Sequence, residues 1–559
     1  MFPLGNTEKM YLSKFVKVED SDLLYEEKGE GEHKGEYKLS KEEKISNTKV
    51  TIDDVAIEVE DTKLNAVELS PLNVGGGGST DLSSPFEMGH LETPGQLTLE
   101  KEGMPEEIKS IYSLTPKRID SKYPKMSLAF KVTDYDDNPL SNISQVIVKN
   151  FKLTFPKCLI LADGSGKGTL TEDTYEIAET SFVPNTDVFS LDLQLISFEN
   201  SEPGGKLDIA TGGNFKLSYD VLLESDIAIK LSSVPTEELK IKLTPVVSIS
   251  EIPIASVSGQ IDPVLEIEST TVELEGLPDF LQDDDVKLDL TNPQIVLNVS
   301  NPLEIPILIN ATMQGLKNGV PTHEKEVKTG NIEIPANQDI TIILSKLGGT
   351  DDPVNNIKYK EINNLNDIFL IIPEQIKLDI NSEADQSKKH TIDLGITYPI
   401  EMNYKMDMPL SFGPELVIIY NETIDGWNND IKDLKDLDMG KIYLAASVEN
   451  TIPLEFHMSG YAIDVNGNKL DGITVGVANN QPIVPGKGTA ETAGLSSLTI
   501  EIVTQNKNSG IMKKIDGVVL RFKANSTSTV NGIPLKSSQY ILMKNMKATL
   551  PEGASVNLN

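Results

Sequence analysis

The stretch PQIVLNVSNPLEIPILINATMQG, residues 293–315, decides the fold class. Apolar and polar side chains alternate from Ile295 to Val299, and a second alternating run follows Pro306. A period of two places one face of a strand in a core and leaves the other face in water. Because proline has no amide hydrogen, Pro306 should lie at the start of a strand or on a sheet edge. The stretch therefore predicts two half-buried strands joined by a turn.

A diverged copy of this pattern, GKIYLAASVENTIPLEFHMSGY, spans residues 440–461. Asn301 and Asn450 hold the same place near the turn, and Pro306 and Pro453 hold the same place after it. Each copy is followed by a proline-led turn and another strand. Repeated supersecondary units indicate tandem homologous modules. We therefore expect the last two modules of the chain to superpose.

Alternating runs recur along the chain, for example at residues 215–221, 239–243 and 498–503. Turn-forming residues separate them, which is the spacing of antiparallel sandwiches and barrels, whereas strands of a doubly wound parallel sheet read as continuous apolar runs. The sequence predicts an all-β fold class, with tandem antiparallel Ig-like β-sandwich modules in an elongated array. A long, curved barrel-like sheet is the alternative, and a continuous apolar tunnel through two modules would favour it.

Helical patterns are few. Residues 104–112 have Pro105 and two glutamates in a possible first turn, and Trp427, Ile431 and Leu434 have helical spacing. We expect two short helices that close the ends of sandwiches.

Proline positions and composition changes suggest four regions. These are an N-terminal β-rich region at 1–116 with a Gly-rich loop at 71–91, β-sandwich modules at 117–253 and 254–408, and a module at 409–559 homologous to the preceding one.

Composition limits the function classes. The chain has 559 residues and a formal net charge of −35, which argues against nucleic-acid binding and against an anionic membrane surface. Its one cysteine, Cys158, excludes an intramolecular disulfide framework. No segment approaches the roughly 20 apolar residues of a spanning helix, and the first 15 residues do not read as a signal peptide. The chain is either cytoplasmic or exported with a leader removed ahead of Met1.

One string, residues 160–169, is similar to the end of a phosphate-binding loop. A P-loop requires a glycine five residues before Gly166, where Leu161 stands, and a helix after the lysine. The residues after Lys167 read as a strand. We expect a Gly-rich hairpin loop.

Several acidic turns could bind calcium, which takes six to eight oxygen ligands. The candidate ligands are Asp464, Asn466, Asn468 and Asp471, but the loop lacks the sixth-position glycine and the final glutamate of an EF-hand. Asn466-Gly467 is also a strong signal for a tight two-residue hairpin. A hairpin alone is the first interpretation, and a hairpin with calcium is the second. Two further acidic clusters, at 134–137 and 283–285, read as solvated loops. No other cofactor is expected.

Catalytic motifs are not recognisable. The five histidines are far apart in the sequence, no Gly-x-Ser-x-Gly string occurs, and His457 should point outward from its strand. Packing on the end of a sandwich is the first interpretation of the lone tryptophan, Trp427, and a sugar platform is the second. We expect a protein that is not an enzyme.

Three phrases resemble secreted or lipid-anchored all-β surface proteins of Bacteroidetes. They are SGQIDPVLEIESTTVELEGLPDFL (258–281), VLNVSNPLEIPI (296–307) and LRFKANSTSTVNGIPLKSSQYILMKNMKATLPEG (520–553). The resemblance implies an outer-membrane, cell-surface location, a lipoprotein signal ending in cysteine, and a role in surface assembly, adhesion or glycan capture. The chain shows neither that signal nor that cysteine, so the cytoplasmic interpretation stays open.

The function expected first is a non-catalytic bacterial cell-surface structural, adhesion or assembly component. A carbohydrate-binding accessory protein at the outer surface is the alternative, and a hydrolase with an unmarked carboxylate pair is the third. The expected partners are other surface proteins or subunits of an assembly, and glycans.

Overall fold

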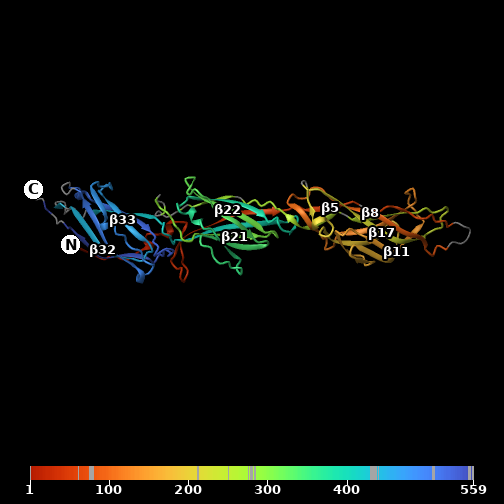
Figure 1. Ribbon diagram of the computed structural model, residues 1–559, viewed down its shortest axis with the longest axis horizontal. Helices are drawn as coiled ribbons and strands as arrows, with labels where there is room; N and C mark the ends of the chain where they lie inside the picture. The colour runs from red at the N-terminus through yellow and green to blue at the C-terminus, as the bar shows by residue number, and fades with distance from the viewer. Residues whose placement is uncertain are drawn as a thin grey trace.

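The protein is an elongated all-β molecule, as the alternating runs predicted. The computed structural model describes all residues except 1, 61, 75–80, 211–212, 250, 268, 275, 277–280, 282–284, 428–436, 439, 506–509, 552–554 and 557–559. Three bodies follow one another along the long axis (Figure 1), and we call them the terminal, central and distal modules. The helical turns with described bounds are 3-10 turns of three or four residues.

The distal module lies at the end opposite the two termini (Figure 1). Its strands are β5 (Val55–Val59), β6 (Thr62–Lys63), β7 (Val67–Glu68), β8 (Phe86–Lys101), β9 (Ile108–Pro116), β10 (Lys125–Thr133), β11 (Ile143–Thr154), β12 (Leu159–Asp163), β13 (Thr169–Thr171), β14 (Thr174–Phe182), β15 (Asp187–Ser197), β16 (Leu207–Asp208), β17 (Phe215–Leu231), β18 (Lys242–Ile249), β19 (Ile252–Ile261) and β28 (His390–Asp393). The strand order β13-β14-β11-β17-β8-β5-β19-β9-β15-β10-β18 is continuous. The expected boundaries near 116 and 253 fall inside this one module, because β9 pairs with β19.

The central module packs two sheets face to face. Its strands are β3 (Leu24–Glu26), β4 (Tyr37–Thr51), β20 (Thr270–Glu273), β21 (Gln294–Asn301), β22 (Ile307–Lys317), β23 (Val320–Pro321), β24 (Val327–Ile334), β25 (Gln338–Ser345), β26 (Ile357–Glu361), β27 (Gln375–Ala384) and β29 (Thr397–Pro409). One sheet runs β20-β27-β22 with β24 beside β22, and the other runs β26-β25-β21-β29-β4-β3. Buried and half-exposed residues alternate strictly along β21, so its apolar side chains face the opposite sheet.

The terminal module repeats the strand pairing of the central module. Its strands are β1 (Phe2–Gly5), β2 (Met10–Tyr11), β30 (Ile418–Ile424), β32 (Lys441–Asn450), β33 (Glu455–Ile463), β34 (Ile473–Val477), β35 (Gly494–Thr504), β36 (Gly517–Asn525) and β37 (Tyr540–Thr549), with β31 (Leu437–Asp438) paired to β38 (Ser555–Val556). Strand β32 pairs with β35 and β37 as β21 pairs with β25 and β29. Strand β33 pairs with β34 and β36 as β22 pairs with β24 and β27. The two segments that share a sequence pattern therefore share these strand pairings, although in the terminal module β34 also pairs with β35 and joins the strands into one sheet.

The two repeated asparagines make the same three hydrogen bonds. In the central module, Asn301 Nδ2 donates to the carbonyls of Ile305 (3.0 Å) and Pro335 (2.9 Å), and its Oδ1 accepts from the amide of Leu303 (3.1 Å). Both asparagines are almost fully buried. Each one ties the turn between the first two strands to the turn before a later strand.

In the terminal module the partners are equivalent. Asn450 Nδ2 donates to the carbonyls of Leu454 and Val484, at 3.0 Å each, and its Oδ1 accepts from the amide of Ile452 at 2.9 Å. We call this set of three hydrogen bonds the asparagine bracket. Its partners lie at the same distances along the chain in both modules, which explains why asparagine stands at both positions. A buried backbone group without a partner costs free energy, and the side-chain amide supplies both the donors and the acceptor that this turn needs.

The N-terminal residues contribute strands to all three modules. Strand β1 pairs with β37 in the terminal module, β4 pairs with β29 along its whole length in the central module, and β5 pairs with β8 and β19 in the distal module. The chain thus runs out along the molecule within its first 60 residues and returns through β20 to β37. The region 1–116 does not form a sheet of its own in the described part of the chain.

The junctions between modules are built from paired and packed residues. Strand β28, which precedes β29 of the central module, pairs with β19 of the distal module. At the other junction, Tyr37 is fully buried, its amide donates to Leu535 (2.9 Å) and its carbonyl accepts from Leu410 (2.9 Å). One continuous apolar cluster extends through the distal and central modules and reaches Leu535. These contacts favour a stiff molecule over a string of loosely linked domains.

The prediction of a helix at residues 104–112 is wrong. A turn occupies its first residues, and strand β9 begins at Ile108. Pro105 and the two glutamates suggested a helical first turn, but β9 pairs with β19 from Ile108 onward. Register shifts in this pairing allow Ile108 and Ile111 both to be buried from a strand. The other expected helix, around Trp427, continues into residues outside the described part.

Cys158 gives a direct test of this packing. Burial raises the pKa of its thiol to about 12, and the side chain is fully buried just before β12. Because only the thiolate reacts, we expect no reaction of the folded protein with Ellman's reagent at pH 8, and one thiol per chain after denaturation in guanidinium. Rapid labelling of the folded protein would contradict the packing around Cys158.

Candidate functional site: a polar recess on the central module

The candidate site is a recess on the outer face of the sheet β25-β21-β29. Residues that alternate with the core positions of these strands point outward, and the register places them in two rows. Thr341, Asn298 and Asn403 form one row across the three strands. Asp339, Ser300 and Glu401 form the next row. These six side chains form a polar surface, with two side chains on each of the three strands.

A loop before β26 forms one wall of the recess. Asp352 accepts hydrogen bonds from the amides of Val354 (3.1 Å) and Asn355 (3.3 Å) and from Asn355 Nδ2 (2.7 Å), which hold its pKa below the usual range. Asn356 has a φ of +53°, a conformation that asparagine tolerates better than most residues. Its carbonyl accepts from the amide of Thr341 at 2.9 Å. The loop is therefore fixed against the edge of the polar rows.

The recess has a volume of about 490 Å³, and its side chains carry amide, hydroxyl and carboxylate groups. Thr341 Oγ1 donates to Asn298 Oδ1 at 2.9 Å. The amide nitrogen of Asn298 is therefore the group of this side chain that could donate to a ligand. Amides and carboxylates are the groups that recognise hydroxyl-rich ligands by hydrogen bonding. None of the described residues that line the recess is aromatic, so this surface offers hydrogen bonds rather than ring stacking.

Sequence reasoning missed this recess. The alternating run from Ile295 to Val299 placed Asn298 on the outer face of a strand but did not mark it as part of a site. The signal lay in polar residues at alternate positions of three runs, but these runs are up to about 100 residues apart in the chain, and only their pairing register brings them together.

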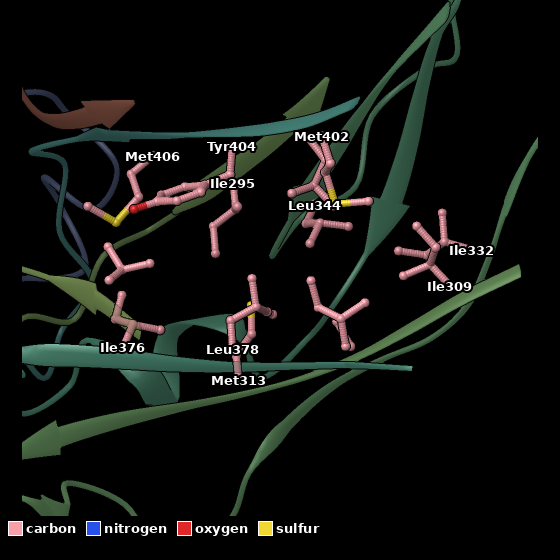
Figure 2. Close-up of a pocket in the computed structure, with 14 residues that line it drawn as sticks. Ile295, Ile309, Met313, Ile332, Leu344, Ile376, Leu378, Met402, Tyr404 and Met406 are labelled. Carbon is pink, nitrogen blue, oxygen red and sulfur yellow. The ribbon is translucent and has the colours of Figure 1, made fainter. Parts of the chain in front are cut away.

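The interior of the central module is shown in Figure 2. Side chains from both sheets meet there, among them Met313 of β22, Leu378 of β27, and Met402 and Met406 of β29. The gap between them has a volume of about 30 Å³ and a wholly apolar lining, so it corresponds to about one water molecule and would stay dry. The central module is therefore a packed sandwich and does not contain a lipid-sized tunnel in its described part.

The calcium candidates lie in the turn between β33 and β34. Asp464 Oδ1 accepts from the amides of Asn466 and Asn468, at 2.9 Å each, and Oδ2 accepts from Asn468 Nδ2 at 3.4 Å. These bonds, led by the amide of Asn468, lower the pKa of Asp464. The carboxylate of Asp464 thus fixes its own turn, and Asp471 is exposed three residues beyond Asn468.

The tight two-residue hairpin expected at Asn466-Gly467 is wrong. Gly467 has a φ of +79°, but Asn466 has no positive φ, whereas a primed turn needs both. The amide of Gly467 donates to the carbonyl of Asp464 (2.9 Å), so the loop spans Asp464 to Asn468. The same arrangement occurs in the distal module, where Asp134 accepts from Asp136 and Asn138.

Trp427 is half-buried against the core of the terminal module. Its side chain packs on the apolar cluster that includes Ala462, Leu470 and Val518, and its backbone amide donates to the carbonyl of Asp516 at 2.7 Å. Residues Ile431 and Leu434, which shared its expected helix, lie outside the described residues. Packing accounts for the position of Trp427.

The remaining motifs have structural roles. The Gly-rich string at 160–169 connects β12 to β13, and the amides of Ser165 and Gly166 donate to Asp163 instead of facing a ligand. His457 is about half exposed, and its Nε2 lies 2.9 Å from Glu455 Oε1. Asp285 bonds Arg521 at 2.9 Å, while Asp283 and Asp284 lie outside the described residues.

Comparisons with known proteins give weak similarities. No protein-family model and no curated protein matches the chain. The solved structures similar to it include a predicted secreted protein from Parabacteroides distasonis, with a TM-score of 0.38 and 18% identity, covering 51% of this chain and 81% of that one. The structure of T=1 particles derived from infectious bursal virus has a TM-score of 0.15 and 8% identity, covering 95% of this chain and 81% of that one. Within the described residues, no helix is long and apolar enough to cross a membrane.

Proposed function

We propose that the chain is a non-catalytic structural or adhesion component of a bacterial cell surface, exported and held at the outer membrane. The observation that carries the proposal is the out-and-back course of the chain. Both termini lie at one end of an elongated molecule, and the distal module lies at the other (Figure 1). Attachment through either terminus would hold the distal module away from the attachment point.

The free end of the distal module is formed by loops. Strand β17 pairs Ile229 with Phe86 and Leu231 with Ile143, so these residues lie at the end remote from the central module. The turn at 134–138 and the loops at 183–186 and 232–238 are therefore at the tip. Val183 (56% exposed) and Val234 (47% exposed) are apolar contacts available there. Loops at the end of a rigid scaffold are a common place for recognition.

The net charge of −35 fits this role because it keeps a long molecule soluble and repels like-charged surfaces. The joined core and the strand-paired junctions supply stiffness. The proposed partners are other surface proteins or subunits of an assembly.

Antibody labelling and protease treatment of intact source cells test the proposal. We expect an antibody fragment against the tip loops to label the distal module on intact cells, and added protease to remove that module. A cytoplasmic marker protein should survive the same treatment. Labelling that appears only after lysis would contradict a surface role.

A second candidate is carbohydrate binding, which the polar recess of the central module favours. A glycan array would show binding that the double variant Asn403→Ala, Thr341→Ala abolishes. Lys405→Ala, on the same strand face beyond the recess, is the matched control and should bind normally. Carbohydrate binding at the recess would be contradicted if the array shows no ligand, or if the double variant still binds. The structural role would not be affected by either result.

A further inference from the structure

A histidine and two glutamates converge on the outer face of the distal module. Strands β8 and β17 pair so that His90 lies opposite Asp226 and Glu92 lies opposite Glu224. Positions two apart on a strand share a face, so all four side chains project to the same side of the sheet. One imidazole nitrogen of His90 and one carboxylate oxygen each of Glu92 and Glu224 lie within 4.8 Å of one another.

The imidazole is oriented by a carboxylate behind it. His90 Nδ1 lies 2.9 Å from Asp226 Oδ1, and Asn150 Nδ2 donates to Asp226 Oδ2 at 2.8 Å. With Nδ1 committed to Asp226, Nε2 is the nitrogen left to bind a cation. A carboxylate that holds the second nitrogen is the usual companion of a metal-binding histidine.

The orienting amide comes from an irregular point in the neighbouring strand. Asn150 has a φ of +51°, and β11 shifts its register against β17 between Lys149 and Lys152. Bulges of this kind redirect a side chain and are frequent beside functional sites. Here the bulge aims Asn150 at Asp226.

The two glutamates lack a compensating cation. Like charges directly opposite on paired strands are unfavourable, and neither Glu92 nor Glu224 has an ion-pair or hydrogen-bond partner among the described residues. Lys152 is opposite Glu224 on β11, but its amine is engaged by Glu176 at 3.1 Å. Farther along the same strand pair, Glu100 is matched by Lys216. The carboxylate pair beside His90 is thus an exception to the local charge pairing.

We propose that His90, Glu92 and Glu224 bind a divalent transition-metal ion such as zinc, with Asp226 as the residue that positions the imidazole. Zinc accepts imidazole nitrogen and carboxylate oxygen as ligands, and three protein ligands leave a fourth position for water or for a group of a partner molecule. Tetrahedral zinc with bonds of about 2.0 Å needs ligand atoms about 3.3 Å apart, which small rotamer changes of exposed side chains can supply.

Isothermal titration of the untagged full chain with zinc, after removal of bound metal by chelator, tests the proposal. We expect one equivalent of zinc per chain at this site. Asp226→Asn should weaken binding by about 10- to 100-fold, as loss of an outer-shell partner does. The double variant Glu92→Gln, Glu224→Gln should weaken it further, and so should His90→Ala.

His457→Ala is the matched control, because His457 is also a strand histidine beside a glutamate, and it should leave the affinity unchanged. Thermal unfolding without metal checks that each variant is folded. Cobalt substitution should give the visible absorption of a tetrahedral site in the native chain and not in the double variant. Zinc affinity that is equal in the native chain and the double variant, or no zinc binding at all, would overturn the proposal.

Discussion

Replacing Asn450 by leucine is expected to destabilise the terminal module by about 3–5 kcal/mol. The variant removes three hydrogen bonds and leaves the carbonyls of Leu454 and Val484 and the amide of Ile452 buried without partners. Each buried unpaired group costs about 1–3 kcal/mol, so the sum is a large part of the stability of one module. Hydrogen exchange with mass spectrometry would show which module opens.

The matched experiment uses the other copy of the bracket. Asn301→Leu should produce a loss of similar size, with increased exchange in the central module instead. Asn298→Leu changes the same side chain on the outer face of the same strand and should cost less than about 1 kcal/mol. If Asn450→Leu and Asn298→Leu have equal effects, the asparagine bracket does not stabilise the fold.

Replacing Tyr37 by alanine is expected to cost about 3–5 kcal/mol and to loosen the junction between the central and terminal modules. The side chain is fully buried where β4 begins, and the Tyr37 backbone is hydrogen-bonded to the backbones of Leu410 and Leu535. Truncating a buried aromatic side chain removes its contacts and leaves a cavity. Chemical denaturation would measure the loss, and small-angle X-ray scattering would detect bending at the junction.

Tyr37→Phe separates packing from hydrogen bonding. It removes only the bond from the hydroxyl to the carbonyl of Val16, at 3.3 Å, and should cost about 1 kcal/mol. A Tyr37→Ala variant that is no less stable than Tyr37→Phe, with an unchanged scattering curve, would show that this side chain does not hold the junction.

The period-two patterns and the turn residues determined the fold class by themselves. Alternation is a local property: each strand shows in its own sequence which face is buried, so the all-β architecture could be predicted run by run. The duplicated phrases around Asn301 and Asn450 likewise predicted two segments with one pattern, and the two segments share their main strand pairings, although β34 also pairs with β35 in the terminal module. The loop at 160–169 could be separated from a phosphate site because the required helix was missing.

Local reasoning failed where a pattern fits two structures. Pro105 and the two glutamates suit the first turn of a helix, but the residues from Ile108 onward pair as strand β9 with β19. Asn466-Gly467 favours a two-residue turn, but the carboxylate of Asp464 accepts two amides and stabilises a longer loop. At β9 the pairing with a distant strand decided between the alternatives, and at Asn466-Gly467 the side chain of the nearby Asp464 decided.

Only the tertiary structure decided how the modules are assembled and where chemistry gathers. Nothing in the charged first 51 residues indicates that β4 completes a sheet with β29, more than 340 residues away. The polar recess and the cluster of His90, Glu92 and Glu224 likewise depend on which strands are neighbours and in which register. A shift of one residue would turn these side chains to the other face, and register is fixed by pairing between distant segments, which no local stretch of sequence encodes.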